Sequence, residues 1–70
     1  MMEVYINDDF IKLQQVLKLA RLVDEGSQAK FVINEGLVKL NGNICTQRGK
    51  KVVPGDKVYY DGNTVTVLKK

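Results

Sequence analysis

Residues 36–46 read Gly-Leu-Val-Lys-Leu-Asn-Gly-Asn-Ile-Cys-Thr, and within this stretch the chain changes from a helical to an extended pattern. Asn41-Gly42 separates two runs of four residues, and Asn-Gly favours the positive φ angles of a type I′ turn. We therefore predict a β-hairpin over residues 37–46. Gly36 suits the left-handed residue that follows a helix C-terminus, so a helix is expected to end just before it.

Further along the chain, turn residues and alternating apolar residues continue the strand pattern. Pro54-Gly55 fits the two central positions of a type II turn. Residues 57–60 and 64–68, separated at Asp61-Gly62, predict a second hairpin. Residues 3–6 could form a short first strand, and we expect it to pair with the last strand, because both would otherwise leave exposed edges.

Between the first strand and Gly36, the spacing of apolar residues predicts two short helices. In the first, the Asn-Asp-Asp run at 7–9 offers capping oxygens, and Phe10 is assigned to the core. The second is capped within residues 24–27. The apolar stripes lie at the i, i+3, i+4 spacing of amphipathic helices; their members are Phe10, Leu13, Val16, Leu17 and Ala20 in the first helix and Ala29, Val32 and Ile33 in the second.

The expected fold class is therefore α+β, with two short antiparallel helices packed on a small, mostly antiparallel β-sheet. A length of 70 residues predicts one domain, residues 1–70. No apolar run is long enough to span a bilayer, and the N-terminus lacks the basic and apolar regions of a secretory signal. The single cysteine, Cys45, cannot form an internal disulfide, so we expect a reducing, cytoplasmic location.

An enzymatic function finds little support in the residue types. The chain has no histidine to act as a base near neutral pH. Cys45 lies in a predicted strand and is interpreted as a buried packing residue. A tetrahedral zinc site of the common type within one chain is excluded by the absence of histidine and the single cysteine. We expect no catalytic residue, no metal, no cofactor and no small-molecule substrate.

The charge is unevenly distributed. Residues 1–36 carry a net charge of −2, whereas residues 37–70 carry +5. A basic half on a small domain suggests a polyanionic partner. The loop at 47–51, Gln-Arg-Gly-Lys-Lys, concentrates three cations around a glycine that lets the backbone approach a ligand. Two interpretations are open for this loop: a solvated surface segment, or a phosphate contact.

The helices offer a second candidate surface. Lys12 and Lys30 could share an exposed face if the helices pack antiparallel, with Lys18 and Arg21 nearby in sequence. The backbone amides at Ser27 and Gln28 would then add donors for phosphate. Ordinary surface charge explains the same residues. Of the two adjacent tyrosines Tyr59 and Tyr60, one should face outward; this weak aromatic content argues for structured RNA rather than single strands.

Several of these segments together resemble a known family, the S-four RNA-binding domain, also called the alpha-L motif. The resemblance covers roughly residues 10–60 and is greatest to short, single-domain bacterial members. It rests on residues 13–20, on Gly-Ser-Gln-Ala-Lys at 26–30, on residues 34–42, on Arg-Gly-Lys-Lys-Val at 48–52 and on Pro-Gly-Asp at 54–56.

This resemblance implies two helices on a small antiparallel sheet, and binding of structured RNA, often ribosomal or transfer RNA. It implies no catalytic activity, since no enzyme domain is attached. Glu25 and Gly26 depart from the family pattern by adding a negative charge and removing a cation, so binding is expected to depend more on the 48–51 loop. The RNA-binding residues that the pattern implies are Lys12, Lys18, Ser27, Gln28, Lys30, Lys39, Arg48, Lys50 and Lys51.

The sequence-based prediction is thus a ribosome- or RNA-metabolism-associated protein, not an enzyme, that binds folded RNA through one basic face and has no membrane partner. Two rivals stay open. One is a protein-interaction module on a ribosome or an assembly intermediate, with a ribosomal protein as partner. The other is an accessory subunit that positions RNA for a separate modifying enzyme.

Overall fold

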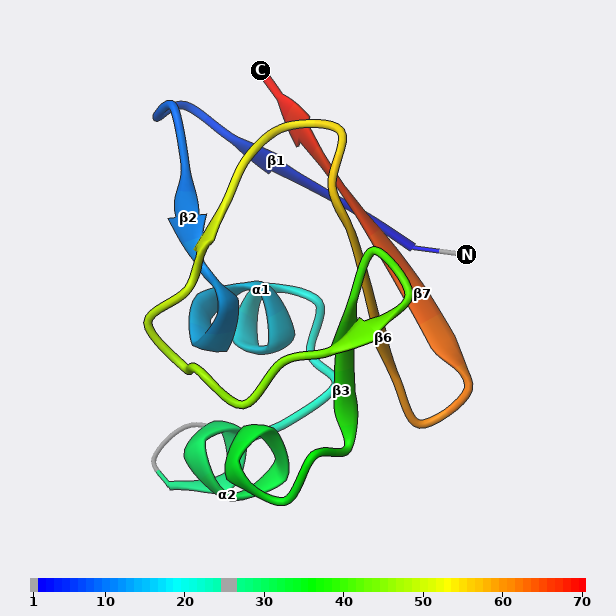
Figure 1. The fold of residues 1–70 in the computed structure, drawn as a ribbon. Coiled ribbons are helices and arrows are strands. Elements are labelled where there is room, and N and C mark those ends of the chain that lie inside the picture. The colour runs from blue at the N-terminus through cyan, green and yellow to red at the C-terminus, as the bar shows by residue number, and fades with distance from the viewer. Residues whose placement is uncertain (1, 25–26) are drawn as a thin grey trace.

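The computed structural model describes residues 2–24 and 27–70. Within these residues, two helices and seven strands follow one another; Figure 1 shows their arrangement. Their bounds are β1 (Met2–Ile6), β2 (Ile11–Lys12), α1 (Leu13–Leu19), α2 (Gln28–Asn34), β3 (Val38–Leu40), β4 (Asn43–Ile44), β5 (Lys51–Val52), β6 (Lys57–Tyr60) and β7 (Asn63–Lys69).

Five strands form the main sheet, in the order β1-β7-β6-β3-β4, and β2 and β5 form a separate two-stranded sheet. All pairs are antiparallel except β1 and β7, the first and last strands, which run parallel. The predicted α+β fold is confirmed, and so is the predicted pairing of the terminal strands. Lys70 extends that pairing, since its backbone N–H donates to the Ile6 carbonyl at 2.9 Å.

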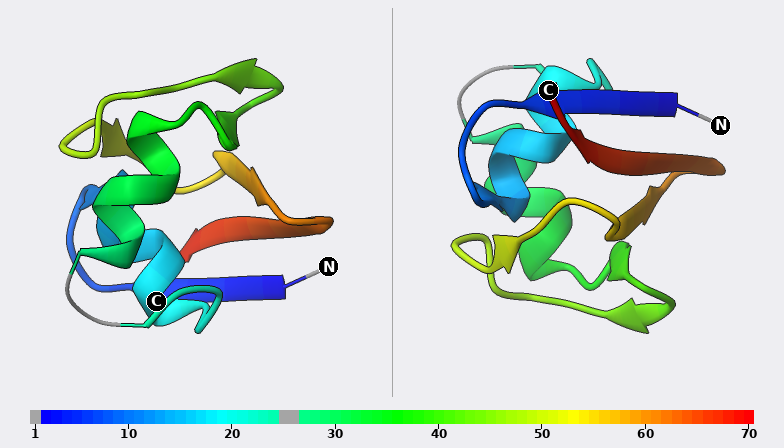
Figure 2. Two further views of the ribbon diagram at one scale, coloured as in Figure 1. Left: turned by 90° about the horizontal axis from the view of Figure 1, so that it is seen from below. Right: turned by 90° about the horizontal axis from the view of Figure 1, so that it is seen from above.

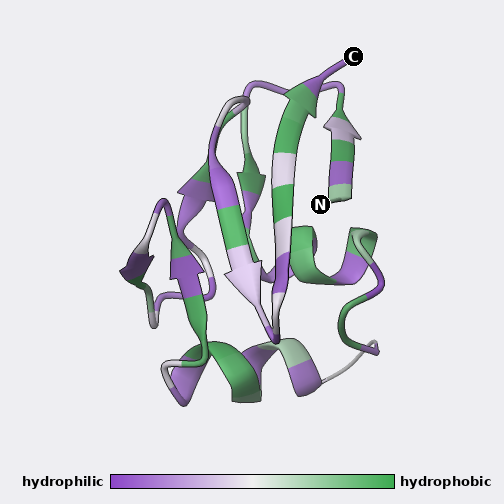
Figure 3. Ribbon diagram, turned by 90° about the vertical axis from the view of Figure 1, so that its right-hand side faces the viewer, coloured by the Kyte–Doolittle hydropathy of each residue, from purple (hydrophilic) through white to green (hydrophobic). Residues whose placement is uncertain are grey.

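Both helices and the β2–β5 pair lie on the same side of the five-stranded sheet (Figures 1 and 2). The core fills the space between them, because alternate strand residues point toward the helices. Figure 3 shows the resulting bands of hydrophobic and polar residues along the strand that ends at the C-terminus. The largest fully buried side chains are Leu13, Val16, Leu17, Ile33, Val38, Val52, Val58, Val65 and Val67.

The predicted turns are confirmed by their backbone angles. Asn41 and Gly42 have φ angles of 52° and 89°, as a type I′ turn requires. Gly55 has a φ of 99°, and the N–H of Asp56 donates to the Val53 carbonyl at 3.0 Å, which closes the turn after Pro54. The predicted second hairpin also forms around Asp61-Gly62, between β6 and β7.

The predicted start of the first helix is wrong. The helix begins at Leu13 with Lys12 as its N-cap, and residues 7–9 form a bend that does not cap it. Ile11 instead pairs with Val52 of β5, which holds residues 11–12 in an extended conformation. This pairing joins segments some forty residues apart, so the local apolar spacing gave no indication of it.

Two burial assignments also need correction. Phe10 is not a core residue, because 39% of it is exposed once residues 11–12 become a strand. Cys45 lies one residue beyond β4 and is half-buried rather than fully buried, although it packs against the core. The second helix matches its prediction, since Ala29, Val32 and Ile33 are its buried residues.

Candidate functional site

The short β2–β5 sheet places two lysines directly opposite each other. In its register Ile11 faces Val52 and Lys12 faces Lys51. The Ile11–Val52 pair points to the core, where Val52 is fully buried, so both lysines point to solvent. Directly opposed side chains on an antiparallel pair have Cβ atoms about 5 Å apart, and like charges there are destabilising.

Arg48 and Lys50 join these lysines because their loop is bonded to the start of α1. The Leu13 N–H donates to the Lys50 carbonyl at 2.9 Å, and the Gln14 N–H donates to the Arg48 carbonyl at 3.1 Å. These carbonyls thus satisfy two of the amides that a helix N-terminus leaves unpaired. We name the resulting group of four exposed cations, Lys12, Arg48, Lys50 and Lys51, the loop cluster.

Backbone access to the loop cluster is open at Gly49. A side chain placed at Gly49 would meet no atom within 4 Å, so the loop backbone faces free space. The turn itself is closed by the Lys50 N–H, which donates to the Gln47 carbonyl at 3.1 Å. The space beside Gly49 that a side chain would fill is therefore open.

Phe10 forms part of the same surface. The Lys51 Nζ atom lies 4.8 Å from the centre of the Phe10 ring, within the range of a cation–π contact. Sequence reasoning missed this role because it assigned Phe10 to the helix stripe. The exposed Phe10 ring therefore lies beside the loop cluster.

The carboxylate nearest in sequence to Phe10 is already engaged elsewhere. Asp9 accepts a 2.8 Å hydrogen bond from Lys69 in an ion pair, and the hydrogen bond and charge of Lys69 hold the pKa of Asp9 below its ordinary value. Within residues 2–24 and 27–70, no ion pair links a cation of the loop cluster to a carboxylate. The four cations of the cluster are thus exposed without a carboxylate partner among the described residues.

The outer face of α2 forms a second surface on the helix side. Ser27, Lys30, Phe31 and Asn34 recur at helical spacing and line a shallow hollow of about 280 Å³. Phe31 is 60% exposed, and the sequence contained the indication for it, since Phe31 lies off the stripe of buried residues. This arrangement combines one cation, one aromatic ring and two polar side chains.

Gln28 has a structural contact at the entrance to α2. Its side-chain oxygen accepts a hydrogen bond from the Asp24 N–H at 2.7 Å. Ser27 is the N-cap residue but makes no side-chain capping bond. Glu25 and Gly26, the two positions that depart from the family pattern, lie outside the described residues.

Two predicted site residues lie apart from the loop cluster. Lys18 is half-buried in the last turn of α1, about 9 Å along the helix axis from Lys12. Lys39 lies on the other side of the molecule, because its neighbour Val38 points to the helices and is fully buried. The structure thus groups Lys12 with the 48–51 loop and separates Lys39 from them.

Two negative findings hold for the described part of the chain. Residues 2–24 and 27–70 contain no group of three potential metal-ligating side chains. Neither helix in this portion is long and apolar enough to cross a membrane.

A family model, two relatives and a solved structure match most of this chain. The family model described as S4 domain matches residues 4–68. The "Putative RNA-binding protein YbcJ" of Escherichia coli is 38% identical over 58 residues, 83% of each chain. The "Probable ribosome maturation protein RlbA" of Bacillus subtilis is 36% identical over 59 residues, 84% of this chain and 83% of that protein. The solution structure of E. coli YbcJ, described as having an alfaL motif involved in RNA binding, covers 97% of this chain and 87% of its own, with a TM-score of 0.74 and 33% identity.

Proposed function

The chain belongs to the S4 domain family, and from this premise we propose that it binds structured RNA through the helix side of the molecule, without catalysing a reaction. The relatives support the class of ligand, since YbcJ is named as RNA-binding and RlbA is named for ribosome maturation. Ribosomal RNA is therefore the first RNA to test, and transfer RNA the second.

One observation carries the proposal: Lys12 and Lys51 are fixed opposite each other on a two-residue ladder, with Arg48 and Lys50 bonded beside them. Bringing like charges together costs free energy in the unbound protein. A phosphate backbone lowers that cost and releases its own counterions. Binding therefore favours a polyanion whose phosphates match this fixed arrangement.

Structured RNA fits this arrangement better than a flexible strand. Proteins recognise RNA helices mainly by shape and by phosphate and 2′-hydroxyl contacts. The loop cluster presents its cations on a ladder and a bonded loop, which fix the positions of their Cα atoms. We assign supporting contacts to Lys30 and Ser27 on α2 and to Lys18 at the end of α1.

Two pairs of adjacent lysines give a matched test. Lys50→Gln/Lys51→Gln removes two cations from the loop cluster, and Lys69→Gln/Lys70→Gln removes two from the C-terminus. Both variants lower the net charge equally. Each lost phosphate contact lowers the slope of log affinity against log salt by about 0.7–0.9, so the first variant should lose about 1.5 units. The second should keep nearly the whole slope.

The measurement is fluorescence anisotropy with a short blunt-ended RNA hairpin over a series of salt concentrations. Circular dichroism checks that both variants are folded. Equal changes in slope for the two variants would mean that RNA senses only the net charge, and the loop cluster would then lose its assigned role. Crosslinking in cells, followed by sequencing of the bound RNA, identifies which RNA the protein holds.

A further inference from the structure

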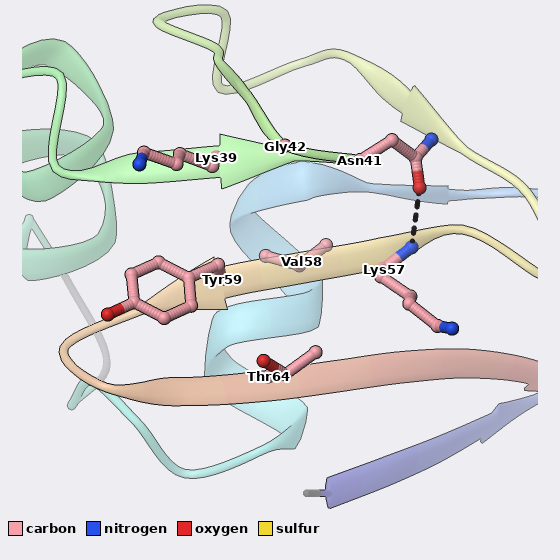
Figure 4. Close-up of a pocket in the computed structure, with 7 residues that line it drawn as sticks. All are labelled: Lys39, Asn41, Gly42, Lys57, Val58, Tyr59 and Thr64. Carbon is pink, nitrogen blue, oxygen red and sulfur yellow. Dashed lines mark hydrogen bonds between the residues drawn. The ribbon is translucent and has the colours of Figure 1, made fainter.

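The open face of the five-stranded sheet, opposite the helices, carries a groove that the proposed contact surface does not use. Its volume is about 500 Å³, which lies within the range of small-ligand sites. Figure 4 shows the strands that form it, with α1 behind them. The groove is lined by Lys39, Asn41, Gly42, Lys57, Val58, Tyr59 and Thr64.

The strand register arranges the lining residues in order. Lys39 of β3 pairs with Tyr59 of β6, and Tyr59 pairs with Thr64 of β7, so these three side chains form one row across the sheet. Neighbouring strands are about 4.8 Å apart, so Lys39 and Thr64 lie on the two sides of Tyr59 in this row. Lys57 lies two residues from Tyr59 on the same strand and therefore on the same face.

The ring in this row is accessible. Tyr59 is 42% exposed, and the Lys39 Nζ atom lies 5.8 Å from the centre of its ring. At this distance the cation–π contact is at the outer limit of the useful range and leaves the ring available to another partner. An exposed aromatic ring beside cations is the arrangement on which proteins stack the bases of single strands.

The charges around the ring select an anion. None of the seven lining residues that the structure describes is acidic, and two are lysines. The neighbouring carboxylate of Asp56 already accepts hydrogen bonds from the Asn41 side chain at 3.0 Å and from the Val53 N–H at 2.9 Å. The Asn41 side-chain oxygen in turn accepts from the Lys57 N–H at 2.9 Å, so this wall of the groove is fixed (Figure 4).

We propose that this groove binds an unpaired ribonucleotide, with its base stacked on Tyr59 and its flanking phosphates on Lys39 and Lys57. The inference rests on the proposed function, and it adds a single-stranded segment that flanks the structured RNA. Thr64 offers its hydroxyl to the ribose or the base edge. The protein then contacts RNA on both sides of the sheet, folded RNA on the helix side and an unpaired nucleotide on the open side.

The chain contains a matched control for Tyr59. Tyr5 is also exposed on the open face, but it lies on β1, where its hydroxyl donates to Glu3 at 2.9 Å. The carboxylate of Glu3 repels phosphate there. Tyr59→Ala should therefore weaken nucleotide binding, Tyr59→Phe should preserve it because the ring remains, and Tyr5→Ala should have no effect.

The first experiment compares a blunt RNA hairpin with the same hairpin carrying an unpaired extension. The wild-type protein should bind the extended hairpin more tightly. Tyr59→Ala should lower affinity for the extended hairpin by about five- to hundredfold, the range that corresponds to loss of one base–aromatic stack, and leave the blunt hairpin unaffected. Equal wild-type affinity for the two hairpins overturns the groove assignment and leaves the proposed function intact.

The second experiment tests the groove independently of folded RNA. Titration of a short single-stranded ribo-oligonucleotide into the isotope-labelled protein should shift the backbone amide signals of Lys39, Tyr59 and Thr64. No shift at these amides overturns the inference, even if the hairpins bind. Equal shifts with a glutamate-rich peptide also overturn it, because they would assign the groove to acidic chains in general. Failure of both hairpins to bind would refute the proposed function. The oligonucleotide titration would still show whether the groove binds an unpaired nucleotide.

Discussion

Val52→Ala should loosen the attachment of the loop cluster to α1. Its effect on the rest of the fold should be no larger than that of Val65→Ala, the matched substitution in the main sheet. Val52 is fully buried and follows Lys51 directly, and it holds β5 against the core below β2 and α1. Val65 is also fully buried but lies in β7, in the main sheet. Val65→Ala therefore removes the same atoms from an equally buried position that does not support the loop.

The magnitude follows from the atoms removed. Each buried methylene contributes about 0.8 kcal/mol, and both variants lose two carbons and gain a cavity, so the free energy of unfolding should fall by about 2–3 kcal/mol. A chain of this size has a total stability of about 4–10 kcal/mol. Both variants should stay folded at room temperature, with the melting temperature lowered by about 10–20 °C.

Native-state hydrogen exchange separates the two variants. The Leu13 and Gln14 amides donate to the Lys50 and Arg48 carbonyls, so they exchange when the loop detaches. Loss of about 2 kcal/mol of local stability at β5 should speed their exchange by about thirtyfold in Val52→Ala. Val65→Ala should leave these two rates nearly unchanged. Equal acceleration in both variants would refute the idea that Val52 anchors the loop cluster locally.

Substitutions at three positions test other local contacts. Asn41→Gly should lower the free energy of unfolding by about 1–2 kcal/mol, because two side-chain hydrogen bonds are lost. Asn41→Ala should lower it by about 1 kcal/mol more, because the φ of 52° at this position disfavours a Cβ. Denaturant unfolding of both variants measures these changes. Lys69 lowers the folded-state pKa of Asp9, so the ion pair stabilises the protein at pH values above the ordinary carboxyl pKa. In acid unfolding, the wild-type protein should therefore be more stable than Asp9→Asn above that pKa. This difference in stability should vanish as the pH falls through the lowered pKa of Asp9. Glu3→Gln should lower the raised pKa of Tyr5, because the hydrogen bond and charge of the carboxylate raise it; an unchanged ultraviolet titration of Tyr5 would contradict this contact.

Local physical chemistry made much of this fold predictable from the sequence. Asn41-Gly42 specified a hairpin because few residue pairs accept two consecutive positive φ angles. Alternation around Val58 separated Tyr59, which is exposed, from Tyr60, which packs against the core. The stripe of Ala29, Val32 and Ile33 likewise specified the buried face of α2. In each case the residues that decide the structure are neighbours in the chain.

Tertiary pairing decided what these local patterns left open. The antiparallel contact of Ile11 with Val52 converted the predicted first helical turn into a strand, exposed Phe10 and set Lys12 opposite Lys51. Strand alternation predicts that Lys39 and Val38 point to opposite faces of the sheet. Only the packing of the helices determined which of these two faces is covered and which is open. The sequence therefore determined most of the elements and which residues carry charge, but not the β2–β5 pair. The side of the molecule on which each charge lies was decided by contacts between distant segments, which no short stretch of sequence encodes.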